Sequence, residues 1–272
     1  MKNSNTLSHS ISAYRKTTKE KIDPRCIPQK LKGPVPEGKK IIYPNYSQDD
    51  HDIWKFLYLR QMKFLHGKVS DEYLHGIERL NLSSEKIPSL SYLSSILKRT
   101  TQWSIARIPG VIEVEDFFPF IKRRVFPSRD FMRNKDEMDY TPVPDLFHDI
   151  FGHMPMLTDS NFASFYQKFG EAAVNANNEN RKLLERFHWF TVDFGLIKKR
   201  TGLKVYGAGI VSSLNEIKHA LSDEVEILDF DPERIVHQEF EPTHIQPVLF
   251  VIESFKQLED GFLNWIKSKG LL

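Results

Sequence analysis

The most informative segment of the chain is Pro144-Asp-Leu-Phe-His148-Asp-Ile-Phe-Gly-His153-Met-Pro155. It places two histidines five residues apart in a mostly apolar run between prolines. Buried imidazole nitrogens need polar partners, and neutral imidazole is a common ligand of iron, zinc and copper. The pattern therefore indicates a metal site at His148 and His153. The alternative is that one of them is a hydrogen-bonded core histidine, since this spacing alone is a weak motif.

A third candidate ligand is Asp193, in the stretch Arg186-Phe-His188-Trp-Phe-Thr-Val-Asp193-Phe-Gly195. A carboxylate among aromatic and β-branched residues is costly unless it is paired or bound to a metal. Two histidines and one carboxylate are typical of non-haem iron(II) sites, whereas structural zinc usually takes four protein ligands, often cysteines. The chain has one cysteine, Cys26. We interpret His148, His153 and Asp193 as an iron triad; the alternative for Asp193 is an arginine partner.

His188 and Asp193 also lie five residues apart, in a predicted helix over residues 179–194. At about 100° per residue, such a pair lies about 140° apart around an ideal helix. Both side chains can therefore reach one metal only if the helix ends or bends, and Phe194-Gly195 is a helix stop signal. We assign Asp193 as the ligand and place His188 behind the ligands. The alternative for His188 is a half-exposed histidine bonded to water.

Three blocks of the sequence resemble the tetrahydropterin-dependent aromatic amino acid hydroxylases. They are Tyr140-Thr-Pro-Val-Pro-Asp-Leu-Phe-His-Asp-Ile-Phe-Gly-His153, His188-Trp-Phe-Thr-Val-Asp-Phe-Gly195 and Lys204-Val-Tyr-Gly-Ala-Gly-Ile-Val-Ser-Ser213. The similarity extends from about residue 43 to about residue 255, in the form of the short bacterial phenylalanine 4-hydroxylases. It implies an Fe(II)- and tetrahydropterin-dependent monooxygenase that hydroxylates an aromatic amino acid ring with O2. Phenylalanine to tyrosine is the expected reaction, in phenylalanine catabolism.

The resemblance also implies contacts for the pterin, which is tetrahydrobiopterin or a relative of it, and for the amino acid. Backbone groups of the loop 108–117 are expected to bond the pterin, and an arginine to bind the substrate carboxylate. The residues expected at the pterin are Ile108, Gly110, Ile112, Phe117, Asp149 and His188. Those expected at the substrate are Arg133, Thr141, Pro144, Trp189, Gly209 and Ser212. The alternatives are an ordinary strand, turn and helix start at 108–117, and a surface charge at Arg133.

The chain departs from this family at two positions of the second block. The family's carboxylate ligand is normally Glu and the residue before its Trp is normally Tyr, where this chain has Asp193 and His188. Because Asp is one methylene shorter, the backbone or the metal must move by about 1 Å. A second hypothesis is therefore a retuned member that oxidises another aromatic metabolite or acts as a metal-dependent oxidase. A third is a metal-binding protein without turnover.

The predicted fold class is mainly α with small β elements (α+β), as one catalytic domain over residues 43–272. At 272 residues, with 40% hydrophobic and 12% aromatic residues, the chain can bury one large core. Alternation predicts a strand over 103–109. Apolar periodicity and capping residues predict helices over 47–66, from Ser70, and over 90–101, 161–174, 179–194, 213–221 and 252–267.

Residues 1–42 are predicted to form a basic, partly disordered extension. Residues 1–40 hold ten Lys or Arg against three acidic residues, a charge of +7, whereas the rest of the chain carries −5. Prolines interrupt helices there and no series of aromatic residues accompanies the charge, so we expect a solvated arm that binds neither nucleic acid nor membrane. Removal of residues 1–40 is expected to leave turnover and melting temperature nearly unchanged.

The remaining expectations concern compartment and assembly. Residues 1–30 are polar and lack the apolar core of a secretory signal, no stretch approaches the roughly 20 apolar residues of a membrane span, and one cysteine suits a reducing compartment. We therefore expect a cytoplasmic protein. The sequence leaves no room for the regulatory domain or the tetramer-forming helix of the family's animal members, which predicts a monomer.

Overall fold

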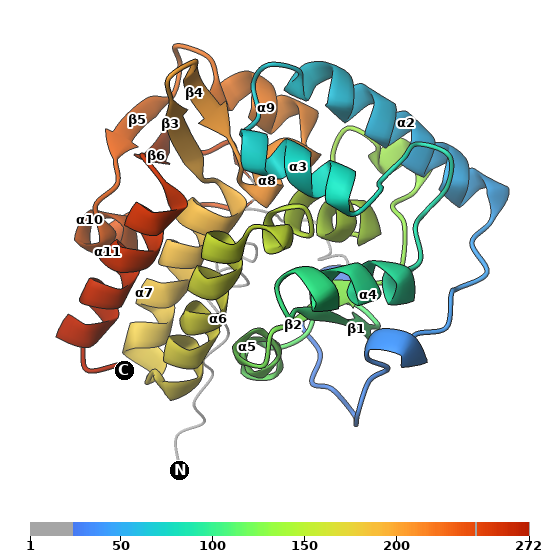
Figure 1. The fold of residues 1–272 in the computed structure, drawn as a ribbon, viewed down its shortest axis with the longest axis horizontal. Coiled ribbons are helices and arrows are strands. Elements are labelled where there is room, and N and C mark those ends of the chain that lie inside the picture. Colours follow the sequence, from blue (N-terminus) through green and yellow to red (C-terminus); the bar gives the residue numbers. More distant parts are fainter. Residues whose placement is uncertain (1–23, 243, 272) are drawn as a thin grey trace.

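Helices make up most of the structure, a computed structural model that describes residues 24–242 and 244–271 (Figure 1). The α-helices are α2 (Gln48–Leu65), α3 (Asp71–Arg79), α4 (Leu90–Thr100), α5 (Val114–Lys122), α6 (Ser160–Asn175), α7 (Asn178–His188), α8 (Ala208–Ser212), α9 (Leu214–Ala220), α10 (Pro232–His237) and α11 (Phe255–Ser268). The strands are β1 (Ser104–Ile108), β2 (Val125–Arg129), β3 (Leu196–Lys199), β4 (Gly202–Val205), β5 (Glu226–Asp229) and β6 (Val248–Ile252). This architecture confirms the predicted mainly helical class with small β elements.

Capping residues explain where several predicted helices begin. The hydroxyl of Ser47 accepts a hydrogen bond from the amide of Asp50, whose carboxylate accepts one from the amide of Ser47. This capping box begins α2 one residue after the predicted start. The helix predicted over 252–267 begins later, because the segment up to Ile252 forms β6 and Ser254 then caps α11. The prediction did not include the four-stranded sheet, whose strands are only four or five residues long.

The largest part of the core is aromatic and lies among α6, α7 and α11, which run side by side (Figure 1). The ring of Phe262 on α11 lies 5.4 Å from that of Phe165 on α6 and 5.0 Å from that of Phe187 on α7. All three side chains are fully buried. Such ring contacts add specific geometry to the burial of apolar area. The helices that end at the candidate site are therefore held on a rigid support.

The two sheets connect segments that are distant in sequence. Strands β1 and β2 pair in parallel, and a second sheet has the order β4-β3-β6-β5, with only β3 and β4 antiparallel. The hairpin of β3 and β4 returns the chain to Asp193, because Gly207 lies directly against that residue. A Cβ on Gly207 would lie 2.4 Å from the carbonyl oxygen of Asp193, so only glycine allows this approach.

The part of the predicted N-terminal extension that the structure describes, residues 24–42, packs against the domain. The amide of Gln29 donates to the carbonyl of Val111, and the carbonyl of Gln29 accepts from the amide of Glu113. Arg25 forms an ion pair with Glu137, and Ile41 is 5% exposed. The expectation of a solvated arm was therefore wrong for this segment. Its hydrogen bonds and buried apolar side chains hold it on the domain despite its positive charge. Residues 1–23 lie outside the described residues.

Deletion of residues 1–40 is now expected to lower stability, contrary to the sequence prediction. The deletion removes the backbone pairing of Gln29 and the ion pair of Arg25, each hydrogen bond contributing about 1 kcal/mol. We expect a melting temperature several degrees lower than that of a matched variant lacking only residues 1–23, measured by calorimetry. Equal melting temperatures for the two truncations would show that residues 24–40 add nothing to stability.

Candidate active site

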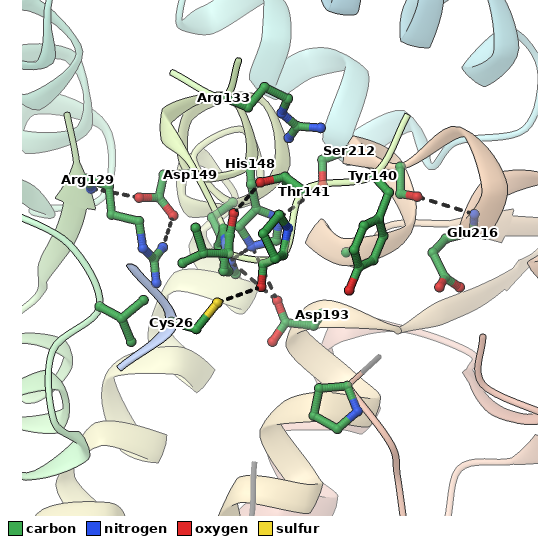
Figure 2. Close-up of a pocket in the computed structure, with 18 of the residues that line it drawn as sticks. Cys26, Arg129, Arg133, Tyr140, Thr141, His148, Asp149, Asp193, Ser212 and Glu216 are labelled. Carbon is green, nitrogen blue, oxygen red and sulfur yellow. Dashed lines mark hydrogen bonds and ion pairs between the residues drawn. The ribbon is translucent and has the colours of Figure 1, made fainter. Parts of the chain in front are cut away.

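The candidate site is a cavity of about 430 Å³ between η4 (His148–His153), η6 (Trp189–Asp193), α8 and the N-terminal segment (Figure 2). His148, His153, His188 and Asp193 all line it, although they come from two segments of the chain. A cavity of this volume is typical of small-molecule sites. Among the residues that the structure describes, no helix is both long and apolar enough to cross a bilayer.

The two histidines of the signature meet because their segment is a π-helix. The amide of Met154 donates to the carbonyl of Asp149, which closes an i to i+5 turn. This wider turn brings residues five apart onto one side, whereas an α-helix would separate them. As a result, the Nε2 atoms of His148 and His153 lie 3.0 Å apart.

Asp193 reaches the same point from a second π-helical turn. The amide of Phe194 donates to the carbonyl of Trp189, so α7 ends at His188 and the chain continues in the wider turn. The Oδ1 atom of Asp193 lies 3.4 Å from Nε2 of His153 and 3.8 Å from Nε2 of His148. Donor atoms bound at about 2.1 Å and at right angles lie about 3.0 Å apart. The three side chains therefore fit one metal ion, with no side chain needing a large shift.

The hydrogen bonds around His148 leave its Nε2 atom free to bind a metal. The hydroxyl of Ser212 donates to the carbonyl of Ala208, so this hydroxyl accepts from the Nδ1–H of His148, at 2.9 Å. The proton is then on Nδ1, and the lone pair on Nε2 faces the cavity. Burial, helped by the charge of Arg129, lowers the pKa of His148 to about 3. Burial also holds the pKa of His153 well below its usual value, so both rings are neutral.

Asp149 is a second carboxylate near the histidines, with an oxygen that lies within 4.8 Å of a nitrogen of each ring. Both of its oxygens are already engaged: Oδ2 accepts from the amide of Arg129 at 2.7 Å, and Oδ1 accepts from its guanidinium at 2.6 Å. Burial raises the pKa of Asp149 to about 6 although Arg129 opposes this shift. Within residues 24–242 and 244–271, Asp193 has no arginine partner of this kind, so the geometry favours Asp193 as the third ligand.

His188 lies behind Asp193 and faces the carboxylate rather than the histidine pair. Its Nδ1 atom lies 3.0 Å from Oδ2 of Asp193, and its Nε2 atom lies 2.9 Å from the hydroxyl of Tyr166. Burial would raise the pKa of Asp193, but the proximity of His188 holds it below its usual value. The carboxylate is therefore ionised and its second oxygen is fixed in orientation by His188.

Replacing His188 with alanine is expected to weaken metal binding without abolishing it. The variant keeps His148, His153 and Asp193 but loses the hydrogen bond that orients the carboxylate, a change that typically costs about 10- to 100-fold in metal affinity. Titration of the metal-free protein with Fe(II) under anaerobic conditions measures this effect. His188→Gln, which can still donate to Asp193, is the matched control. Affinity equal to that of the unmodified protein would contradict the role given to His188.

Arg133, expected to bind the substrate carboxylate, is 5% exposed, which excludes the surface-charge alternative. Its Nε and Nη2 atoms donate to the two oxygens of Asp145 at 2.8 and 2.9 Å. Asp145 therefore binds the edge of the guanidinium that carries Nε and Nη2. Among the described residues, no carboxylate binds Nη1. Arg133 and its neighbours Thr141 and Ser212 line the cavity. The hydroxyl of Thr141 donates to the carbonyl of Val143, so neither hydroxyl has a proton left for a ligand in this arrangement.

An aromatic wall faces the metal ligands. Trp189 stacks between Phe194 and Phe240, with ring centroids 4.6 and 4.5 Å away. Pro144, Trp189 and Gly209 line the cavity, as the resemblance implied. A Cβ on Gly209 would lie 3.0 Å from the ring of Phe194. Glycine at this position therefore lets α8 approach the wall closely.

The residues expected at the pterin do not all line this cavity. Phe117, Asp149 and His188 line it, and so does Val111, which was not among the expected residues. Ile108 is buried at the end of β1, while Gly110 and Ile112 line a second cavity of about 830 Å³ with the N-terminal segment. Side chains alternate between the two faces of an extended segment. Gln29 also pairs with the backbone of this loop, so the carbonyl of Val111 and the amide of Glu113 are already bonded.

Several residues of the cavity were not identified from the sequence. They are Cys26, Ile27 and Pro28 of the N-terminal segment, together with Arg60, Arg129, Tyr140, Phe194 and Glu216. Because the N-terminal segment is strongly basic, a solvated arm was predicted there instead of contacts with the domain. Tyr140 and Phe194 had a visible signal, because Tyr140 begins the first signature block and Phe194 follows Asp193 in the second.

The comparisons with known proteins agree with this geometry. Residues 14–269 match the family model described as biopterin-dependent aromatic amino acid hydroxylase. Phenylalanine-4-hydroxylases of Ralstonia nicotianae and Caulobacter vibrioides are 42% and 40% identical over 218 and 224 residues. These matches cover 79% and 82% of this chain and 70% and 76% of the relatives.

Solved structures of the same kind are also similar. The cold-active phenylalanine hydroxylase of Colwellia psychrerythraea has a TM-score of 0.80 at 33% identity, with 87% of this chain and 93% of that chain covered. The phenylalanine hydroxylase of Chromobacterium violaceum, solved with iron(III) and 7,8-dihydrobiopterin, has a TM-score of 0.79 at 37% identity. That match covers 83% of each chain.

Proposed function

Because the chain belongs to the biopterin-dependent aromatic amino acid hydroxylases, we propose that it hydroxylates phenylalanine to tyrosine with O2, iron(II) and a tetrahydropterin. The observation that carries this proposal is the convergence of His148, His153 and Asp193 in a cavity that also contains a buried arginine. Two neutral imidazoles and one carboxylate are the donor set of non-haem iron oxygenases.

The three ligands would hold iron on one side and leave its other side open to the cavity. Iron and the tetrahydropterin, when bound, supply the activation of O2 that protein side chains lack. Burial keeps the imidazoles of His148 and His153 neutral. The proximity of His188 keeps Asp193 ionised and orients its second oxygen. The aromatic wall of Trp189 and Phe194 excludes water beside the reacting ring.

The cavity also has polar groups that suit a pterin. Arg129 Nε and Trp189 Nε1 are buried, and neither has a hydrogen-bond partner among the described residues. Both residues line the cavity, as does Phe117, which can stack on a flat ring. A heterocycle rich in acceptors fits these unpaired donors. We propose Val111, Phe117, Arg129 and Asp149 as the pterin neighbours and Arg133, Pro144 and Gly209 as those of the amino acid. Trp189 is proposed as a neighbour of both, through its indole N–H and its ring.

Assay of the iron-loaded protein tests the proposal directly. With a tetrahydropterin, O2 and phenylalanine, we expect tyrosine to form in proportion to pterin consumed, measured by chromatography. Tyrosine and tryptophan serve as competing substrates that define the preference. Absence of amino-acid-dependent pterin oxidation with all three amino acids would overturn the proposed function.

A second candidate is a retuned oxygenase, because this chain pairs Asp193 with His188 where the family normally has Glu and Tyr. The His188 contact at 3.0 Å supports a site adapted to the shorter carboxylate. Asp193→Glu separates the two candidates. A large gain in phenylalanine hydroxylation on introducing glutamate would favour the retuned oxygenase, whereas a loss would favour a phenylalanine hydroxylase whose iron site works with aspartate.

The proposal also covers the assembly state, the compartment and the limits of the domain. We propose a monomer in the cytoplasm, where the single cysteine suits a reducing compartment. We propose that the catalytic domain begins before residue 43, because Cys26, Ile27 and Pro28 line the cavity. Light scattering coupled to size exclusion measures the assembly state.

A further inference from the structure

One acidic residue of the cavity, Glu216, has no part in the proposed function as described so far. Glu216, the third residue of α9, lines the cavity and is half-buried. Its amide donates to the hydroxyl of Ser213, but within residues 24–242 and 244–271 no hydrogen bond or ion pair reaches its carboxylate. Burial raises the pKa of Glu216 to about 7, and no cation of the described part of the chain opposes this shift.

The other acids that line the cavity each have a partner. Asp149 is bonded to Arg129, Asp193 to His188 and Asp139 to Arg60, with contacts of 2.6, 3.0 and 2.6 Å. Burial of part of the Glu216 carboxylate without a partner disfavours its charged form, and the carboxylate lies beside the cavity, so a cation or donor on a bound ligand can pair with it. The missing partner of Glu216 is a cation or a hydrogen-bond donor.

The fold places Glu216 on the substrate side of the cavity. Helix α8 ends at Ser212 and α9 begins at Leu214, so Glu216 follows by four residues the serine that orients His148. Figure 2 shows its carboxylate and the hydroxyl of Tyr140 pointing the same way, with Arg133 and Ser212 above them in the view. An amino acid carries one anionic and one cationic group on the same carbon. Arg133 suits the anionic carboxylate, and Glu216 suits the cationic ammonium group.

We propose that Glu216 binds the α-ammonium group of the amino acid substrate. The assignment rests on the proposed function, because it takes the ligand to be an amino acid with its carboxylate at Arg133. A charge-assisted hydrogen bond from the ammonium to the carboxylate is stronger than a neutral one. Glu216 therefore selects α-amino acids over aromatic acids that have the same ring and carboxylate but lack the amino group.

The test compares two ligands that differ only in the ammonium group. Binding of L-phenylalanine and of 3-phenylpropanoate to the iron-loaded protein is measured by calorimetry without O2 or pterin. In Glu216→Gln we expect about 10- to 100-fold weaker binding of phenylalanine and unchanged binding of 3-phenylpropanoate. Glu216→Asp keeps the charge and is expected to retain part of the preference. Glu224→Gln, at an exposed position of the following turn, is the matched control and is expected to bind both ligands normally.

The outcomes distinguish this inference from the proposed function. If the unmodified protein forms tyrosine but Glu216→Gln binds phenylalanine as tightly as it does, the assignment of Glu216 is wrong and the proposed function stands. Equal weakening of both ligands also overturns the assignment, because it indicates a structural role. If the unmodified protein forms no tyrosine, the proposed function fails and the assignment fails with it.

Discussion

Replacing His153 with alanine is expected to remove iron and turnover together. The imidazole supplies one of three donor atoms, with its Nε2 atom 3.0 Å from that of His148 and 3.4 Å from Oδ1 of Asp193. Two donors remain where the site needs three. Loss of a hydrogen bond behind a ligand already costs about 10- to 100-fold in metal affinity, so loss of the ligand itself is expected to cost more than about 100-fold. His148→Ala is expected to behave in the same way.

Metal analysis and melting curves on four purified variants check this prediction. His148→Ala, His153→Ala and Asp193→Ala are expected to lose stoichiometric iron and keep the fold, because their side chains line a cavity rather than fill the core. His188→Ala is expected to keep iron under saturating conditions. If His188→Ala loses iron while Asp193→Ala retains it, the ligand assignment is wrong and His188 is the third donor.

Replacing Arg133 with glutamine is expected to have the largest effect on stability and to prevent substrate binding. Arg133 and Asp145 are 5% and 0% exposed in their side chains, and two hydrogen bonds join them. Breaking a buried pair on one side leaves an uncompensated charge and costs roughly 3–5 kcal/mol. For a chain of this size we expect the melting temperature to fall by about 10 °C. Asp145 also accepts from the amide of His148 at 3.1 Å, so the metal segment loses support as well.

Two further variants separate the electrostatic effect from the loss of substrate contact. Lys135→Gln breaks the exposed pair with Asp49, whose side chains are 60% and 68% exposed, and is expected to leave stability nearly unchanged. The double variant Arg133→Gln/Asp145→Asn has no buried charge and is expected to recover much of the lost stability while phenylalanine binding remains absent. A double variant no more stable than Arg133→Gln would contradict the buried-charge explanation.

Local sequence signals predicted much of the helical framework. Ser47 with Asp50, Ser70 and Ser89 accept the hydrogen bonds that begin α2, α3 and α4, at or within a residue of the predicted positions. Capping and helical periodicity act over one or two turns, so a short window of sequence contains them. Within the four-stranded sheet, β6 pairs with β3 and β5 across long sequence separations, and no local signal of that kind exists for those pairs. The same reason explains the missed contacts of residues 24–42.

By itself, the sequence determined the chemical identity of the site: two histidines and one carboxylate in signature blocks, with a single cysteine in the chain. Only the tertiary structure decided how these residues meet. Two π-helical turns change the direction of side chains five residues apart, and they depend on hydrogen bonds such as Phe194 to Trp189 that a sequence pattern does not specify. Packing also pairs Asp149 with Arg129, so Asp193 is the carboxylate that is available to a metal. The sequence does not specify this choice, because partners for buried charges come from distant segments. The residue types are a property of the chain, whereas their distances are a property of the fold.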